Sequence, residues 1–419
     1  MNEFNKNIIE LICRYLDKNS NNSFRLCSIY VAKIIGNLLF SNIFISANKI
    51  NKSNKHLFRS FVNKYNLLIN IINVRNLLQL SYFRSFNVKS MRLISKSNFL
   101  YCEYFFPIGL KNLELESTFN QPIRKNTLPS TLETLNFGNE FNQIIKKNVL
   151  PNTLKKITFG TVGAVKCFYD QPIKPNILPN SLEELDLGIN FNQPIGENVL
   201  PNSLKKLDLG YKYKQQITVF PQNLEWLHLG DKYNYPIEQN ILPKTLTVLE
   251  FGIYFNCLIK ENVLPSSLKK IVFGKYFNKQ IGKNVLPAKS LKILVFGYYY
   301  NQEIEEGVLP ACGVNKPQGV LPISLKVLSF GCCFNKKIKK DTLPDSLKVL
   351  CFGYHFMQVI EKIPPKLRTL DLGNEYYNTL PILPLTITTI RFFNNMGYFV
   401  KKIQIGNDCY TKGIMHKMF

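Results

Sequence analysis

Apolar and polar positions recur along most of this chain, and the commonest spacing between copies is 22 residues. The pattern reads Leu-Pro-x-Ser-Leu-x-x-Leu-x-Leu-Gly-x-x-Phe-Asn-x-Pro-Ile, and one clean copy runs from Leu178 to Ile195. A fixed period of this length predicts a solenoid, because one repeat cannot bury its own apolar face but a stack of repeats can. The first strand residues of the copies are Leu110, Leu132, Leu154, Leu182, Leu204, Leu224, Leu246, Leu268, Leu291, Leu325, Leu347, Leu367 and Ile387.

Each repeat predicts a short strand and a sharp turn. The Leu-x-x-Leu-x-Leu segment alternates, so two side chains per turn face outward and the others face the core. Gly188 and its equivalents suit a positive φ or a close backbone approach. The aromatic Phe191 equivalents are expected in the core, and the Asn192 equivalents are expected to form a buried hydrogen-bonded ladder between turns. The Leu-Pro pairs set the turns between repeats.

Worn copies lie at both ends of the array. Val88 and Met91 belong to one, and Val400 and Ile403 belong to the other. Such copies are expected as caps, because the outermost turn has no neighbour to cover it.

The strand segment is the signature of leucine-rich repeats, and the segment after the glycine resembles the FNIP repeat of amoebae and of the giant viruses that infect them. Residues 119–123 and 191–195 read Phe-Asn-Gln-Pro-Ile, and 233–237 read Tyr-Asn-Tyr-Pro-Ile. The resemblance covers residues 107–393. It implies an α+β repeat solenoid, a leucine-rich-repeat-like stack with one parallel β-sheet face, and an origin in such an amoeba or virus.

The N-terminal region has a different pattern, with apolar residues at helical spacing, a polar break and a second apolar stretch. The segment Glu10-Leu11-Ile12-x-x-Tyr15-Leu16-Asp17, followed by Leu26-Cys27, resembles an F-box. The resemblance implies a small α-helical region that docks the adaptor of a cullin-type ubiquitin ligase. The alternative is a simple helical cap over the first solenoid turn. The adaptor-binding residues on the F-box interpretation are Ile8, Leu11, Ile12, Leu16 and Leu26.

The expected organisation therefore has four parts. Residues 1–45 form the F-box-like helical region, and residues 46–106 form a basic linker and N-terminal cap with degenerate repeats. Within that linker, residues 67–80 are expected to form another helix or worn repeats. Residues 107–393 form the repeats, and residues 394–419 form a C-terminal cap.

The outward strand sites are the candidate partner-binding face, because neighbouring copies combine them into one surface. They are acidic and aromatic in the middle turns and apolar in the later turns, and such a patch favours protein docking. The alternative is ordinary β-propensity at exposed strand sites. The residues of this predicted face are Asp186, Asp208, Trp226, His228, Glu250, Val272, Ile293, Val295, Val327 and Val349.

The formal net charge is +25, and stacking is expected to arrange many lysines into basic stripes. These stripes could meet phosphates or an acidic protein, or they could be solvated repeat surface. Lysine follows the first strand leucine at Lys155, Lys205, Lys269, Lys292, Lys326 and Lys348.

Catalytic, metal and cofactor chemistry is not expected. The four histidines are scattered without metal-ligand spacing, and no nucleophile or phosphate-binding motif is found. The ten cysteines lack paired spacing and predict reduced thiols in the cytoplasm or nucleus. No long apolar run predicts a membrane span, and no signal peptide pattern is seen.

Together with the resemblance, these patterns predict a non-enzymatic substrate-receptor subunit of a cullin-type ubiquitin ligase, whose partners are an F-box adaptor and a target protein. Two alternatives stay open. One is a repeat scaffold without a link to ubiquitin, and the other is a solenoid that binds nucleic acid or another polyanion.

Overall fold

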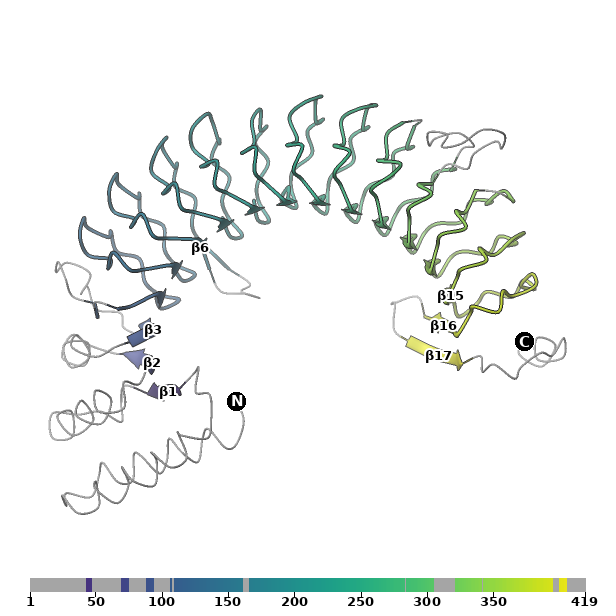
Figure 1. The fold of residues 1–419 in the computed structure, drawn as a ribbon, viewed down its shortest axis with the longest axis horizontal. Helices are drawn as coiled ribbons and strands as arrows, with labels where there is room; N and C mark the ends of the chain where they lie inside the picture. The colour runs from purple at the N-terminus through teal and green to yellow at the C-terminus, as the bar shows by residue number, and fades with distance from the viewer. Residues whose placement is uncertain are drawn as a thin grey trace, which may run out of the picture. The chain divides into compact units, whose positions relative to one another are not determined.

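The computed structural model describes residues 43–46, 69–74, 88–93, 106–107, 109–160, 166–282, 284–304, 321–340, 342–394 and 399–404. The chain forms two units, Met1–Leu204 and Lys205–Phe419, which are called the N-terminal unit and the C-terminal unit. In each unit the strands lie side by side, and the turns that join them lie to one side of the sheet (Figure 1).

The N-terminal unit contains a parallel sheet whose strands pair in chain order. The pairing keeps the repeats in register, so that Leu113 lies opposite Leu135, and Leu135 lies opposite Ile157. The worn copy at Val88 forms a strand of this sheet, with Val88 and Met91 buried. The strands are β1 (Ile43–Ser46), β2 (Ile69–Val74), β3 (Val88–Leu93), β4 (Asn112–Glu114), β5 (Thr134–Asn136), β6 (Lys156–Thr158) and β7 (Glu184–Asp186).

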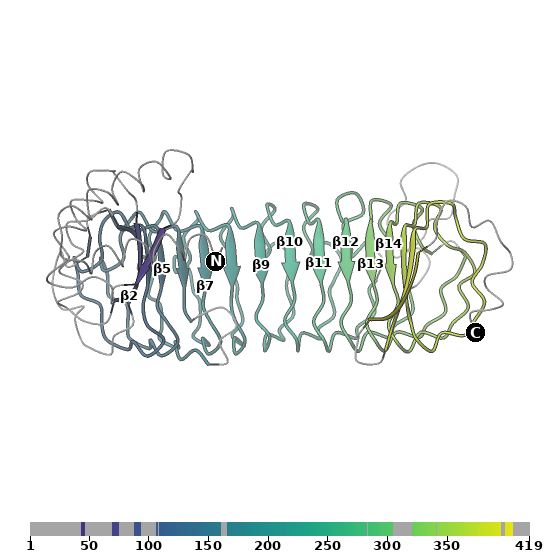
Figure 2. The same cartoon turned by 90° about the horizontal axis from the view of Figure 1, so that it is seen from below.

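The C-terminal unit continues the same plan, with parallel strands that stand next to one another in chain order (Figure 2). Its last strand differs, because β17 runs antiparallel to β16. The strands are β8 (Lys206–Asp208), β9 (Trp226–His228), β10 (Val248–Glu250), β11 (Lys270–Val272), β12 (Ile293–Val295), β13 (Val327–Ser329), β14 (Val349–Cys351), β15 (Thr369–Gly373), β16 (Thr389–Phe393) and β17 (Phe399–Gln404).

The core consists of the repeated leucines and aromatics, as the periodicity predicted. In one turn, Leu268, Ile271, Phe273 and Phe277 are all buried. Equivalent aromatics stack from turn to turn, and the rings of Phe277 and Tyr300 lie 6.0 Å apart with planes only 2° from parallel. Each buried side chain of this size contributes about 1.5–3 kcal/mol, so the stack supplies a large apolar core without disulfides.

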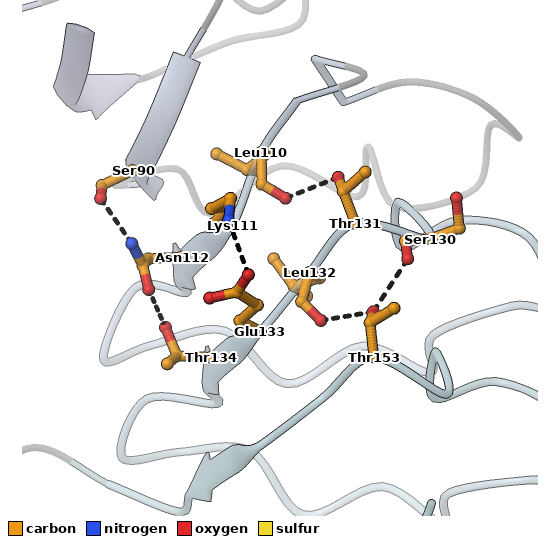
Figure 3. Close-up of polar contacts among 10 residues, drawn as sticks. All are labelled: Ser90, Leu110, Lys111, Asn112, Ser130, Thr131, Leu132, Glu133, Thr134 and Thr153. Carbon is orange, nitrogen blue, oxygen red and sulfur yellow. Dashed lines mark hydrogen bonds and ion pairs between the residues drawn. The ribbon is translucent and has the colours of Figure 1, made fainter. Parts of the chain in front are cut away.

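A ladder of hydroxyl groups connects successive turns at the Leu-Pro-x-Ser/Thr position. The Thr131 Oγ1 donates to the Leu110 carbonyl at 2.9 Å, and the Thr153 Oγ1 donates to the Leu132 carbonyl at 2.7 Å (Figure 3). Further along, the Ser267 Oγ donates to the Leu246 carbonyl at 2.6 Å. Each hydroxyl therefore satisfies the carbonyl of the repeated leucine that lies just before the strand of the preceding turn.

The predicted asparagine ladder is confirmed, although the residues are half-buried or exposed rather than buried. The backbone N–H of Asn278 donates to the Asn256 Oδ1 at 2.9 Å, and the Asn278 Oδ1 accepts from the backbone N–H of Asn301 at 2.9 Å. The same oxygen also accepts from the Gln302 Nε2 at 3.0 Å. Since Asp170 fills the same position in another turn, the ladder uses the acceptor oxygen.

The glycines after the strands meet both predicted needs. Gly138 has a φ of 74°, which favours glycine because side chains clash in the left-handed region. At Gly274 the reason is a close approach, because an added Cβ would lie 1.7 Å from the Gly252 carbonyl oxygen.

The predicted α+β class is wrong, because the described residues form a parallel β-solenoid that contains no helix. The segments between strands contain proline, glycine and asparagines in the left-handed conformation, and each of these interrupts a helix. The described left-handed asparagines are Asn126, Asn148, Asn176, Asn198, Asn240, Asn262 and Asn284.

The ends of the array also differ from the sequence-based expectation. Residues 69–74 form strand β2, which pairs parallel with β1 and β3, so of the two alternatives for residues 67–80 the helix is wrong there and the strand agrees with a worn repeat. The copy at Val400 is not a further parallel turn, because β17 pairs antiparallel with β16 and is largely exposed. The predicted F-box-like helices within residues 1–42 lie outside the described residues.

Candidate functional site

Each three-residue strand presents two side chains outward. The middle residue is buried, and the first and third residues are half-buried or exposed in β4 to β14. Parallel pairing in register places the first residues of the strands in one column and the third residues in another. The outward sites of each unit therefore form one continuous strand face.

The strand face of the N-terminal unit is polar and largely neutralised from within. The Asn112 Nδ2 donates to the Ser90 Oγ at 2.9 Å, and the Asn112 Oδ1 accepts from the Thr134 hydroxyl (Figure 3). On the neighbouring strands, the Lys156 Nζ lies 2.9 Å from the Glu184 Oε2. These side chains are hydrogen-bonded or ion-paired to one another, so this face exposes mainly polar groups to solvent.

The strand face of the C-terminal unit carries a cluster of aliphatic side chains. Val272 lies opposite Val295, Ile293 lies opposite Val327, and Val327 lies opposite Val349. All are half-buried, so each keeps some apolar surface in contact with solvent. We call this surface the aliphatic strip, and it consists of Val248, Val272, Ile293, Val295, Val327 and Val349.

A charged histidine cluster lies on the strands just before the strip. The His228 Nδ1 lies 2.8 Å from the Asp208 Oδ1, and its Nε2 lies 3.7 Å from the Asp231 Oδ1. Burial acts against the charged ring, but the hydrogen bond to Asp208, together with the charges of Asp208 and Asp231, raises the pKa of His228 to about 10. The imidazolium therefore persists at neutral pH as a structural cation, and it is not poised for proton transfer.

A second charged cluster lies at the other end of the strip. Asp371 is buried, and its carboxylate accepts from the Arg391 guanidinium on the next strand. The Cys351 Sγ lies 3.1 Å from the Asp371 Oδ2. Burial, together with the charge of Asp371 and a hydrogen bond to it, raises the pKa of the Cys351 thiol, so this thiol stays protonated and donates to the carboxylate.

Comparison with known families decides the classification. The FNIP Repeat family matches residues 104–140, 119–161, 169–212, 213–254, 255–289, 288–311 and 334–375, which together cover more than half of the chain. The chain belongs to the FNIP repeat family. The resemblance expected from residues 107–393 is therefore confirmed at the level of the repeats.

A solved structure shows the same architecture. The FNIP chain is similar to CroV588, described as a novel circular LRR protein structure, with 34% identity and a TM-score of 0.70. The likeness covers 88% of this chain, and the chain spans 59% of the length of CroV588. YopM from Yersinia enterocolitica WA-314 is more distant, with 18% identity, a TM-score of 0.40 and coverage of 78% of this chain and 72% of YopM. No curated protein matches the chain.

The predicted face residues of the FNIP chain fall into the two units. Asp186 lies in the N-terminal unit, where its Oδ1 accepts from the Gly188 N–H at 2.9 Å and supports the turn. The other nine lie in the C-terminal unit on β8 to β14, at outward strand sites. Glu250 is ion-paired with Lys270 at 2.6 Å beside the strip. The sequence-predicted adaptor residues Ile8 to Leu26 lie outside the described part of the chain.

Two features of the FNIP chain were missed from the sequence. One is the Asp371–Arg391 pair, which depends on the register between two repeats. The other is a ladder of partly exposed tyrosines two residues after the strand glycines: the rings of Tyr254 and Tyr276 lie 5.1 Å apart, and those of Tyr276 and Tyr299 also lie 5.1 Å apart. A tyrosine at this position in successive copies was a readable signal for the ladder.

Other kinds of site were searched for within the described residues. No group of three or more histidine, cysteine or acidic side chains there could hold a metal ion. No described helix is long and apolar enough to cross a membrane. The described cysteines, including Cys257 and Cys351, are free thiols.

Proposed function

We propose that this chain is a non-enzymatic interaction scaffold that binds a protein partner through the aliphatic strip of its C-terminal unit. The observation that carries the proposal is the set of aliphatic side chains at outward sites on β10 to β14, where Ile293, Val327 and Val349 are neighbours in one column and Val272 and Val295 are neighbours in the other. Contiguous apolar surface bordered by charged groups is typical of protein interfaces. Membership in a leucine-rich-repeat-type family supports a scaffold role.

The charged groups around the strip favour binding over catalysis. His228 is held by Asp208 and Asp231, and Asp371 is held by Arg391 and Cys351. Each of these groups is occupied by an internal partner and sits at an end of the strip. They therefore border the proposed interface. A general acid or base would instead need a pKa close to neutral pH and a free path to substrate.

Partner capture in cells tests this proposal. Full-length chain is compared with a Val272→Asp, Val295→Asp, Val327→Asp variant by proximity labelling and mass spectrometry. The variant is expected to lose the proteins that the original chain labels, because three carboxylates would be placed on the apolar surface.

A matched control variant changes three outward sites of the N-terminal unit. Asn112→Asp, Thr134→Asp and Thr158→Asp add the same charge to a face that is already polar. This variant is expected to keep the partners. If the strip variant folds, as judged by its circular dichroism spectrum, and still labels every partner, then the strip does not bind them.

A more specific role is a substrate receptor of a cullin-type ubiquitin ligase in the cytoplasm or nucleus. This role stays a prediction, because the predicted adaptor-binding residues lie outside the described part of the chain. The origin in an amoeba or an amoeba-infecting virus also stays a prediction. Co-purification with an F-box adaptor tests the role. Leu11→Asp and Leu16→Asp are expected to abolish co-purification, and its absence with the original chain contradicts the role.

A further inference from the structure

A row of cations runs along the edge of the C-terminal unit where the strands begin. Each row residue directly precedes a strand, and main-chain hydrogen bonds of 2.8 Å link each one to the next. Their side chains are exposed, except that of Lys326, which is half-buried. We call this the basic row, and it consists of Lys269, Lys292, Lys326, Lys348 and Arg368.

The same position in the N-terminal unit carries both signs of charge, which alternate from Lys111 onward. Lys111, Glu133, Lys155 and Glu183 follow one another there, and the Lys111 Nζ lies 2.7 Å from the Glu133 Oε1 (Figure 3). The carboxylates therefore neutralise the lysines on that edge. The two rows differ in charge and not in backbone position.

The basic row lacks such compensation. Among the described residues, none of its five side chains forms an ion pair. Neighbouring strands are about 4.8 Å apart, so these like charges repel one another at a distance shorter than the screening length at physiological salt. A partner that brings carboxylates to this edge would relieve that repulsion.

The row residues lie next to the aliphatic strip, one residue before the strands that carry it. Lys292, Lys326 and Lys348 are each followed by a strip residue, namely Ile293, Val327 and Val349. A binding segment therefore meets aliphatic surface along one line and positive charge along a parallel line. Nucleic acid would use the charges but leave the aliphatic line unused.

The spacing of the strands selects the shape of the segment. A helix that lies across the strands returns the same face once per turn, about every 5.4 Å, close to the strand spacing of about 4.8 Å. An extended segment repeats the same face about every 6.7 Å, which loses register sooner. One helical turn therefore matches one strand, for the apolar contacts and for the charges.

We propose that the C-terminal unit binds an amphipathic helix of a partner protein, with the apolar face of the helix on the aliphatic strip and an acidic edge over the basic row. This inference rests on the proposed function of the strip and adds the chemistry of the partner. The helix lies across β11 to β14, with its carboxylates facing Lys269, Lys292, Lys326 and Lys348.

Designed peptides test the inference with full-length protein. The probe is a fluorescein-labelled helical peptide of about 18 residues, which is about 27 Å long, with leucines on one face and glutamates along one flank. One comparison peptide has lysines in place of the glutamates, and another has serines in place of the leucines. A single-stranded oligothymidylate serves as the nucleic-acid probe. Fluorescence anisotropy gives the Kd of each.

The acidic peptide is expected to bind at least about tenfold more tightly than the other three probes, and more weakly as salt rises. The charge reversals Lys292→Glu, Lys326→Glu and Lys348→Glu are expected to weaken binding of the acidic peptide at least about tenfold and to strengthen binding of the lysine peptide. The matched control, Lys111→Glu with Lys155→Glu, changes cations at the same repeat position and should leave the acidic peptide unaffected.

The outcomes separate this inference from the proposed function. Equal affinity for the acidic and lysine peptides, or no binding of the acidic peptide, overturns the acidic helix. Tighter binding of the oligothymidylate, lost on charge reversal, also overturns it and favours a polyanion. In each case, loss of cellular partners by the Val272→Asp, Val295→Asp, Val327→Asp variant still upholds the strip as the interface.

Discussion

The Asp371 carboxylate lies opposite Arg391 on the neighbouring strand and binds its guanidinium at two points. The Arg391 Nε lies 2.7 Å from the Asp371 Oδ1, and the Nη2 lies 2.6 Å from the Oδ2. Only 7% of the Asp371 side chain is exposed, whereas 38% of the Arg391 side chain is exposed. The two-point geometry fixes the register of β15 and β16 near the end of the array.

Asp371→Ala is expected to destabilise the C-terminal unit by about 2–3 kcal/mol. A fully buried pair costs about 3–5 kcal/mol when one partner is removed, and here Arg391 still reaches solvent. The shift of the urea midpoint measures the effect. Glu238→Ala breaks the exposed pair with Lys260 and is expected to cost less than about 1 kcal/mol. Equal shifts for the two variants would contradict the role of the buried pair.

His228 is expected to make stability depend on pH. Its pKa is raised from 6.5 to about 10 in the folded chain, so the charged ring stabilises the fold fully below pH 6.5. That stabilisation declines above pH 6.5 and is lost as the pH rises through about 10. The urea midpoint of the original chain minus that of His228→Gln should therefore shrink from pH 6 to pH 10. In an Asp208→Asn background the same difference should change much less, and an unchanged trend there would rule out Asp208 as the cause.

The asparagine ladder is expected to depend on the side-chain oxygen as an acceptor and not on the side-chain NH2 group. Asn278→Asp should be nearly neutral, because Asp170 already fills this position and accepts from the Asn192 N–H at 2.9 Å. Asn278→Ala should cost about 1–3 kcal/mol, because the Asn301 N–H loses its partner. Chemical denaturation compares the two variants. A larger loss for Asn278→Asp than for Asn278→Ala would refute this account.

Close packing of the strand glycines predicts a strong local effect. Gly274→Ala is expected to cost about 3 kcal/mol or more, because its Cβ would meet the Gly252 carbonyl oxygen at 1.7 Å and main chain must move. Gly196→Ala is the control, because nothing lies within 4 Å of the Cβ it adds. Thermal unfolding monitored by circular dichroism should show a lowered transition for the first variant only.

The sequence predicted those features that repeat from copy to copy. Buried residues such as Leu268 and Phe277 follow from periodicity, because each copy places them at the same point of the turn. The outward sites of the strands follow from alternation for the same reason. The ladder at Asn278 was predicted with the wrong environment, because the sequence shows the residue type but not how far the side chain is buried, and Asn278 is only half-buried.

Features that depend on differences between copies were harder to predict. Arg391 and Asp371 are 20 residues apart, and only the strand register brings them together. The absence of helix in the described crossovers follows from backbone conformation at residues such as Asn240, whose φ is 63°. The presence of an asparagine in the sequence does not determine which φ it adopts.

The uniform register has a consequence for engineering. Main-chain hydrogen bonds join Lys269 to Lys292, Lys292 to Lys326 and Lys326 to Lys348 in the same way, although the loops between these residues differ in length. The length of the binding surface along the stack is therefore set by the number of turns and not by the number of residues. Removing or duplicating one whole turn should shorten or lengthen the recognised segment by one strand spacing, about 4.8 Å, and leave the chemistry of every remaining contact in place.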